Sequence, residues 1–138
     1  MIVVDEYLAV RVIRARWPEV LPDDELVLPA SRHWRLLQAL QGGRGGQLSR
    51  LFAGASPAVV SAIRWPHPDV LTVLDPRPLL DDAAVLAARF GGTGLIVAET
   101  LAAGLAHGHQ LWFGTPANVG RLLEHAAQEL GVAVQVAE

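Results

Sequence analysis

The chain has 138 residues, of which 51% are hydrophobic and 18% are charged, and its net charge is -3. A chain of this length can bury a full core, so we expect residues 1–138 to form one domain. Because cysteine is absent, disulfides, thiolate zinc sites and a cysteine nucleophile are excluded, and any metal ion would need carboxylate or His ligands. No apolar stretch reaches membrane-spanning length, and the first residues lack the pattern of an export signal. We therefore expect a cytoplasmic protein with no membrane contact.

The charges are distributed unevenly along the chain. Residues 1–64 hold eight Arg and six acidic residues, whereas residues 65–138 hold three Arg and eight acidic residues. This asymmetry predicts a basic face and an acidic face rather than a uniformly basic protein. All eleven basic residues are Arg, for which a GC-rich coding genome is a sufficient explanation, but Arg also binds phosphate well, so RNA binding is compatible with the composition.

The first residues predict a strand followed by a carboxylate. Ile2, Val3 and Val4 form an apolar run without alternation, which suits a strand covered on both faces, and the helical pattern from Tyr7 to Ile13 follows Asp5 directly. This helix is predicted to end near Trp17-Pro18. Asp5 should then lie at the carboxyl end of a parallel strand, where α/β sheets bind ligands and metal ions. Two roles for Asp5 stay open, because a helix N-cap would also place an Asp there.

The middle of the chain is predicted to be rich in helices. Its segments are a short apolar piece at Leu26–Pro29, a helix capped by Ser31, a glycine-rich connector at Gly42–Gly46, and short helices at Gln47–Phe52 and Pro57–Ile63, the second capped by Ser56.

Strands and helices alternate in the rest of the chain. Strands are predicted at Val70–Leu74, Gln110–Phe113 and Val132–Val136, and helices at Ala83–Phe90, Leu95–His107 and Pro116–Leu130. No two strands have hairpin spacing. This pattern predicts an α/β fold of three layers around a short parallel sheet of about four to five strands.

Basic residues gather around Trp34. Arg32, His33 and Arg35 flank it near a helix start, which as a functional site would be a phosphate clamp with a stacking aromatic ring. The alternative, which the pattern favours, is an exposed polar face with Trp34 turned into the core.

The order of the elements resembles that of the PIN domain, a small nuclease fold found in many toxins of bacterial toxin–antitoxin pairs. The resemblance covers nearly the whole chain and is closest in Val3-Val4-Asp5 and in Leu101–Leu111. It implies a metal-dependent ribonuclease in which three or four carboxylates hold Mg²⁺ or Mn²⁺ at the strand ends. Hard cations prefer oxygen ligands, and a metal-bound water can attack a phosphodiester.

Most of the carboxylates that this family uses are missing. Asp5 matches the first acid, but Ser31–Arg35 stands where the second is expected, and Leu95–Val97 where the third is expected, with Glu99 a little further on. Phe113–Thr115 offers only a hydroxyl at the place of the fourth. The resemblance thus implies Asp5 and Glu99 as metal ligands and catalytic residues.

The remaining roles follow from the same resemblance. Arg11, Arg14 and Arg32 would hold phosphate, and Glu6 and Asp75 are the next carboxylates to consider if others rebuild the site.

Two functions are compatible with this pattern. One is a toxin–antitoxin-type ribonuclease with a degenerate metal site, and the other is a non-catalytic PIN-like module for binding or dimerisation, which the missing acids favour. The high apolar content also favours a buried partner surface. We therefore expect a homodimer or a complex with an antitoxin-like protein, formed through an apolar helix surface.

Overall fold

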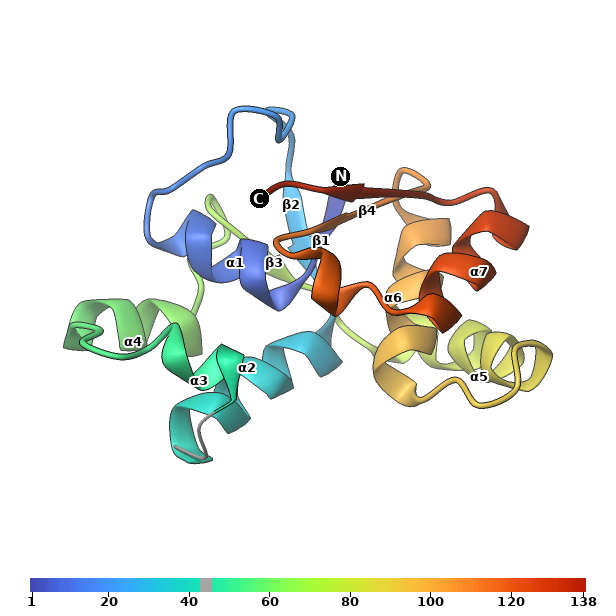
Figure 1. Cartoon of the computed structure of the whole chain (residues 1–138), viewed down its shortest axis with the longest axis horizontal. Coiled ribbons are helices and arrows are strands. Elements are labelled where there is room, and N and C mark those ends of the chain that lie inside the picture. Colours follow the sequence, from blue (N-terminus) through green and yellow to red (C-terminus); the bar gives the residue numbers. More distant parts are fainter. Residues whose placement is uncertain (43–45) are drawn as a thin grey trace.

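The strands of the protein are short and all pair in parallel. The computed structural model describes residues 1–42 and 46–138, and Figure 1 shows how its strands and helices are arranged. They are β1 (Ile2–Val4), β2 (Leu26–Leu28), β3 (Thr72–Val73), β4 (Gln110–Phe113) and β5 (Ala133–Val136), in the order β3-β2-β1-β4-β5. The predicted α/β class and parallel sheet are confirmed.

The central strand is β1, and its position creates a switch point. Val3 pairs with Val27 of β2 on one side and with Leu111 of β4 on the other. The chain moves outward from β1 to β3 and then crosses to β4 on the opposite side of β1. In open α/β sheets the crevice at such a reversal, outside the carboxyl ends of the strands, is where ligands bind. The residues that follow β1 and β4 are therefore the candidates for a binding site.

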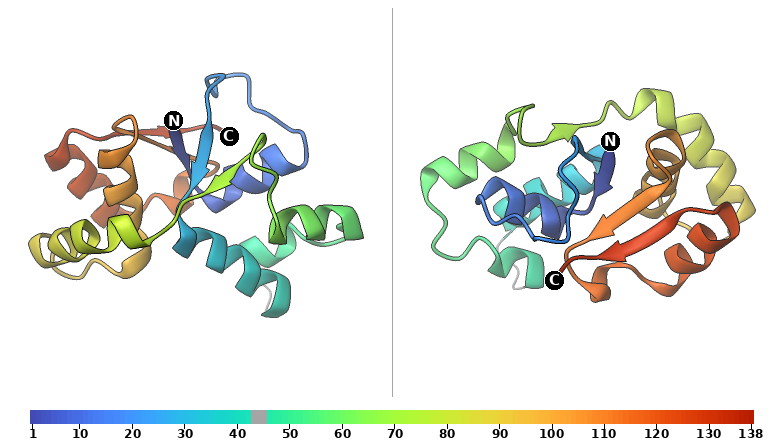
Figure 2. Two further views of the ribbon diagram at one scale, coloured as in Figure 1. Left: turned by 180° about the vertical axis from the view of Figure 1, so that it is seen from behind. Right: turned by 90° about the horizontal axis from the view of Figure 1, so that it is seen from above.

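Helices cover both faces of the sheet, as Figure 2 shows. One face packs against α5 (Leu80–Arg89), α6 (Leu95–Ala106) and α7 (Arg121–Leu130), and the other against α1 (Glu6–Ile13), α2 (Ala30–Gly42), α3 (Gln47–Arg50) and α4 (Pro57–Arg64). Successive strand residues point to opposite faces. Accordingly, Val3 and Phe113 join the first core, whereas Ile2, Val4 and Trp112 join the second.

The first and the last predicted helices are several residues shorter than the sequence pattern predicts. The first ends at Ile13 rather than near Trp17-Pro18, because Ala15 has a φ of 58°, outside the right-handed helical region. The predicted helix Pro116–Leu130 is divided into a 3₁₀ turn, η2 (Pro116–Asn118), and α7. Gly120 lies between them with a φ of 75°, which glycine adopts readily and a helix cannot accommodate.

Two other local predictions are confirmed. The strand Gln110–Phe113 has the predicted bounds, and Ser56 caps α4, since its hydroxyl accepts a hydrogen bond from the Val59 amide at 3.3 Å. A 3₁₀ turn, η1 (Arg77–Leu79), precedes α5. Of the predicted connector Gly42–Gly46, residues 43–45 lie outside the described residues.

A helix that crosses a membrane must be long and predominantly apolar. None of the helices formed by residues 1–42 and 46–138 combines the length and apolar character that a membrane crossing requires.

Candidate functional site

Asp5 lies at the switch point, directly after the central strand, as predicted. Its side chain is only 1% exposed. Oδ1 accepts hydrogen bonds from the amides of Leu8 and Gly114, both at 2.9 Å, and Oδ2 accepts one from the Asn118 side-chain amide at 2.7 Å. Asp5 is therefore the N-cap of α1 and also binds the segment that follows β4. Both carboxylate oxygens are engaged with protein donors.

Gly114 makes this link between β1 and β4 possible. A Cβ atom at this position would lie 2.7 Å from Cβ of Tyr7 and 2.9 Å from the Leu8 amide nitrogen. Both distances are too short for real contacts, and the second atom is backbone that cannot move aside. Only glycine lets the end of β4 approach α1 closely enough for its amide to reach Asp5.

The residue after Asp5 carries a second buried carboxylate. Glu6 is fully buried, and Arg32, which is 1% exposed, places Nη1 2.7 Å from Glu6 Oε2. Arg35, which is partly exposed, places Nη1 2.5 Å from Glu6 Oε1. Two guanidinium groups from α2 thus neutralise one carboxylate from α1. From the sequence, Glu6 was considered only as a further carboxylate for a rebuilt metal site.

Arg32 reaches past Glu6 to the other face of the sheet. Its Nε donates to Thr100 Oγ1 of α6 at 2.7 Å, and its guanidinium carbon lies 5.2 Å from the centre of the Phe113 ring. The Thr100 hydroxyl in turn donates to the Ile96 carbonyl oxygen at 2.7 Å. Arg32 is therefore surrounded by partners in the interior, a position that does not suit the phosphate contact that the resemblance implied.

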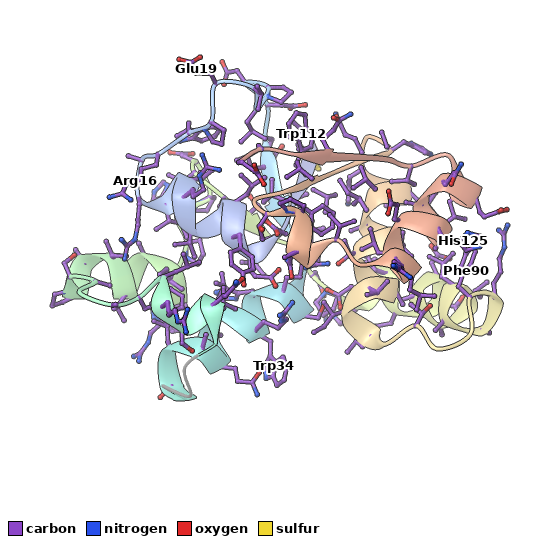
Figure 3. The ribbon with its side chains drawn as sticks, viewed as in Figure 1. Arg16, Glu19, Trp34, Phe90, Trp112 and His125 are labelled. Atoms are coloured by element: carbon purple, nitrogen blue, oxygen red, sulfur yellow. The ribbon has the colours of Figure 1, made fainter. Side chains whose placement is uncertain are left out.

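The expectation for Trp34 was wrong. It is 56% exposed, and Figure 3 shows its ring on the outer side of α2, whereas Arg32 is the residue turned inward. The ion pair with Glu6 explains this inversion, because a buried carboxylate requires a cation more strongly than a Trp requires burial.

Asn118 joins Asp5 to the arginines. Its side-chain nitrogen donates to Asp5, and its side-chain oxygen accepts a hydrogen bond from Arg35 Nη1 at 3.3 Å. A continuous polar network therefore runs across the carboxyl ends of the strands. We call it the strand-end network; its members are Asp5, Glu6, Arg32, Arg35, Thr100 and Asn118.

Glu99 has a separate role. It is 2% exposed on α6, and its Oε1 accepts a hydrogen bond from the Ser31 amide at 3.1 Å. It therefore caps the first turn of α2 from another element. Ser31 itself, which was predicted to be this cap, lies inside the helix, which begins at Ala30. Asp5 and Glu99 share no hydrogen-bond partner among the described residues.

The remaining predicted residues are bound elsewhere. Arg11 and Arg14 lie at the far end of α1 from Asp5, where they donate to the carbonyl oxygens of Ala137 and Leu51. The exposed Asp75 pairs with its neighbour Arg77 at 2.6 Å, which holds the pKa of the Asp75 carboxyl below its usual value.

The side chains at the strand ends do not fit a catalytic metal ion. Within residues 1–42 and 46–138, no three His or acidic side chains are grouped so that they could hold one. Asp5 Oδ1 already accepts two hydrogen bonds and Oδ2 accepts one, so at most one lone pair of Asp5 is left for a metal ion. A cation beside Glu6 would meet the like charges of Arg32 and Arg35.

Burial gives Asp5 an unusual acidity. It raises the pKa of Asp5 from the ordinary 3.8 to about 6, and the neighbouring charge of Glu6 adds to the increase. Hydrogen bonds from Leu8 and Asn118 and the charge of Arg32 act in the opposite direction. Desolvation dominates because the side chain is almost fully withdrawn from water.

Comparisons with models of known protein families, with curated proteins and with solved structures found no match for this chain.

The raised pKa of Asp5 predicts a pH dependence of stability. Because the folded-state pKa lies above the unfolded value, the contribution of Asp5 is fully present below about pH 4 and is lost as the pH rises through about 6. Asp5→Asn removes this titration. The free energy of unfolding of the natural protein should fall relative to that of the variant by about 2–3 kcal/mol between about pH 4 and about pH 8.

Urea unfolding of both proteins across this range measures the effect. In this variant the new side-chain amide would face the side-chain amide of Asn118. This contact changes the free energy of unfolding by an amount that does not depend on pH. A difference between the two proteins that stays constant with pH would contradict the assignment.

The two arginines that bind Glu6 should differ in their importance for stability. Arg32→Met leaves a fully buried carboxylate with one partly exposed partner, so we expect a loss of about 3–5 kcal/mol in the free energy of unfolding. Arg35→Met, the matched control, leaves Arg32 in place and should cost about 1 kcal/mol.

The double variant Glu6→Gln/Arg32→Met should recover part of the loss, because no buried charge is then left unpaired. Denaturant unfolding of the three variants measures these values, and equal losses for both single variants would contradict the central role of Arg32.

Proposed function

We propose that this protein is a PIN-like binding module that does not cleave RNA, in which an arginine takes the place of a metal ion at the strand ends. The observation that carries the proposal is the ion pair of the fully buried Glu6 with the buried Arg32. Arg32 lies in the part of α2 where the resemblance to PIN domains calls for an acid.

The PIN-like part of the proposal rests on the order of the elements. A strand ends at Asp5, a helix-rich middle follows, and the late helix α6 leads through β4 to a Thr115-Pro116 turn, α7 and a last strand. Asp5 stands after the central strand, where the resemblance implies the first acid of the family.

The non-catalytic part rests on what a guanidinium group can do. Like a divalent cation, it compensates buried carboxylates and fixes their positions through directed hydrogen bonds. Unlike a metal ion, it has no open coordination position in which to bind a water and lower the pKa of that water. These constraints favour the binding module over the ribonuclease.

The binding part rests on exposed apolar side chains. Trp65, at the carboxyl end of α4, is 81% exposed, the highest value among the large hydrophobic side chains of the described residues. Exposed aromatic side chains are typical anchors of protein interfaces. Self-association or binding of an antitoxin-like protein through this helix end is the form of association that we propose.

The first test is ribonuclease activity. We expect no cleavage of single-stranded RNA in Mg²⁺ or Mn²⁺ and no binding of Mn²⁺ in calorimetry, because Asp5 and Glu6 are held by protein donors and the carboxylate of Glu99 alone supplies too few ligands for a divalent ion. Asp5→Ala should behave like the natural protein in both assays, provided that its circular dichroism spectrum is unchanged. Metal-dependent cleavage that Asp5→Ala abolishes would instead establish the ribonuclease, with RNA as substrate and Mg²⁺ or Mn²⁺ as cofactor.

The second test is the oligomeric state. Sedimentation velocity at about 30 μM, a concentration at which specific interfaces persist, should give a species larger than the 14.8 kDa monomer. Trp65→Ser should shift it toward the monomer, whereas Trp17→Ser, which changes a half-exposed Trp in a loop, should not. A clean monomer for the natural protein would argue against self-association and leave a separate partner protein as the binding candidate.

A further inference from the structure

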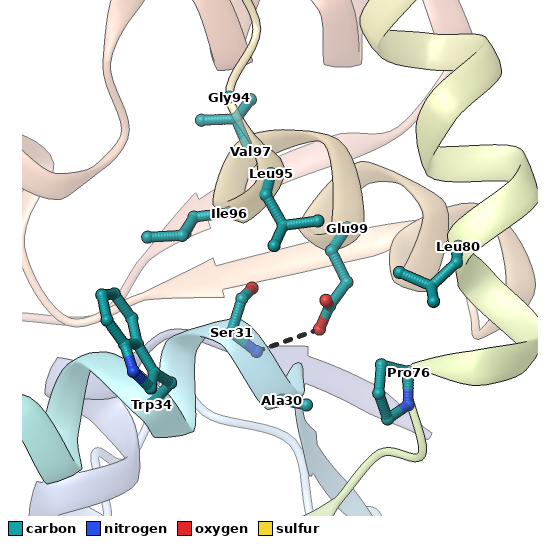
Figure 4. Close-up of a pocket in the computed structure, with 10 residues that line it drawn as sticks. All are labelled: Ala30, Ser31, Trp34, Pro76, Leu80, Gly94, Leu95, Ile96, Val97 and Glu99. Atoms are coloured by element: carbon teal, nitrogen blue, oxygen red, sulfur yellow. Dashed lines mark hydrogen bonds between the residues drawn. The ribbon is translucent and has the colours of Figure 1, made fainter.

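A pocket of about 640 Å³ opens beside the strand-end network. It lies between the first turn of α2, the start of α6 and the segment that leads from β3 into α5. Figure 4 shows Trp34 at one end of the pocket and Leu80 at the other, with Leu95 and Ile96 along one side. The walls are almost entirely apolar. Small-molecule sites commonly have this size and character, with a few polar groups that fix the orientation of the ligand.

The first polar group in this pocket is the carboxylate of Glu99. One of its oxygens accepts the Ser31 amide, and this is the only hydrogen bond to Glu99 found among the described residues. Figure 4 shows the carboxylate at the pocket wall, facing Ser31. The second oxygen is therefore available to a ligand.

Glu99 also lacks a cation within the chain. No ion pair of residues 1–42 and 46–138 includes it, since Arg32 and Arg35 are both directed to Glu6. The N-terminus of α2 stabilises the negative charge of Glu99 only in part. A carboxylate that is 2% exposed among apolar side chains favours the binding of a positive charge.

The second polar group is the hydroxyl of Ser31. Its oxygen is buried and has no hydrogen-bond partner within the described residues, although the residue lines the pocket. Figure 4 shows this hydroxyl pointing from α2 toward α6, on the side where Ile96 and Glu99 lie. Buried hydroxyl groups almost always have a partner. A ligand that donates a hydrogen bond at this point would supply it.

We propose that the pocket binds a small amphipathic amine, a protonated amino group carried on an apolar body. The ammonium group donates hydrogen bonds to the free oxygen of Glu99 and to the hydroxyl of Ser31. An ammonium group has three donors, so it can serve two acceptors at once. The apolar body lies along Leu95 and Ile96, and the exposed ring of Trp34 offers an aromatic face at the mouth of the pocket.

Other ligand classes suit the pocket less well. An anion would be repelled by Glu99, and a neutral apolar molecule would cover the carboxylate oxygen without replacing its water. The proposal does not depend on the absence of ribonuclease activity, because Glu99 and Ser31 lie outside the strand-end network. Amine binding and RNA cleavage can therefore succeed or fail separately.

The probes are three amines, 2-phenylethylamine, tryptamine and cyclohexylmethylamine, added to the full chain at about pH 7.5. Controls of matched shape are 2-phenylethanol, which is neutral, and 3-phenylpropionate, which is an anion. Calorimetry and saturation-transfer NMR should detect binding of at least one amine. We expect affinities at least tenfold weaker for the alcohol and the acid, because each lacks the charged donor.

Two variants test the role of each polar group. Ser31→Ala removes a hydroxyl that has no partner, so the fold should be unaffected, and we expect amine affinity to fall several-fold. Glu99→Gln keeps an oxygen for the Ser31 amide but removes the charge, and affinity should fall about tenfold or more. Glu124→Gln, an exposed position on α7, is the matched control and should change nothing.

The outcomes are decisive in both directions. Selective amine binding that depends on Glu99 and Ser31 supports the site. Failure of all three amines to bind at about 5 mM, the weak end of measurable affinity, would overturn it. Equal binding of amine, alcohol and acid, or binding that is unchanged in Glu99→Gln, would overturn it as well.

Discussion

The neutralisation of Glu6 is the constraint on which the rest of this structure depends. A fully buried carboxylate is tolerated only when cations and hydrogen-bond donors compensate it. Arg32 and Arg35 meet this requirement, and they bring the first half of α2 over the ends of the strands. The contacts of Arg32 with Thr100 and Phe113 then position α6 and the end of β4 around the same guanidinium group. One compensated charge thus orders three elements that are distant in sequence.

The three buried carboxylates at this end of the sheet stabilise the fold. Asp5 caps α1 and binds the Gly114 amide, Glu6 binds two arginines, and Glu99 caps α2. Each stabilises a helix start or a long-range contact through hydrogen bonds or ion pairs within the protein. Among the three, Glu99 keeps an oxygen that a ligand can reach, which explains why the binding site that we infer lies beside the switch point and not at it.

The sequence was sufficient for the class of fold and for the position of Asp5, because both depend on local patterns. An apolar run without alternation, such as Ile2–Val4, predicts a strand covered on both faces, and the alternation of strands and helices predicts a parallel sheet. The arrangement of the site was harder to predict, because the partners of Arg32 and Glu99 are 26 or more residues away in sequence. Two signals were nevertheless present. Glu6 precedes Val10 by one helical turn on a buried face, and Glu99 interrupts an apolar run. Both patterns indicate a buried carboxylate whose charge needs a cation or hydrogen-bond donors nearby.

The contacts made by α2 also bear on how the protein comes apart. Leu36 of this helix packs in the core formed with α1 and α4, yet the first turn of α2 is capped by Glu99 and its Arg32 is bound by Thr100, both from α6 in the opposite layer. The sheet separates the two apolar cores, but these polar links pass beyond the carboxyl ends of its strands. Neither helical layer can detach without breaking them, so we expect the two cores to open together as one cooperative unit.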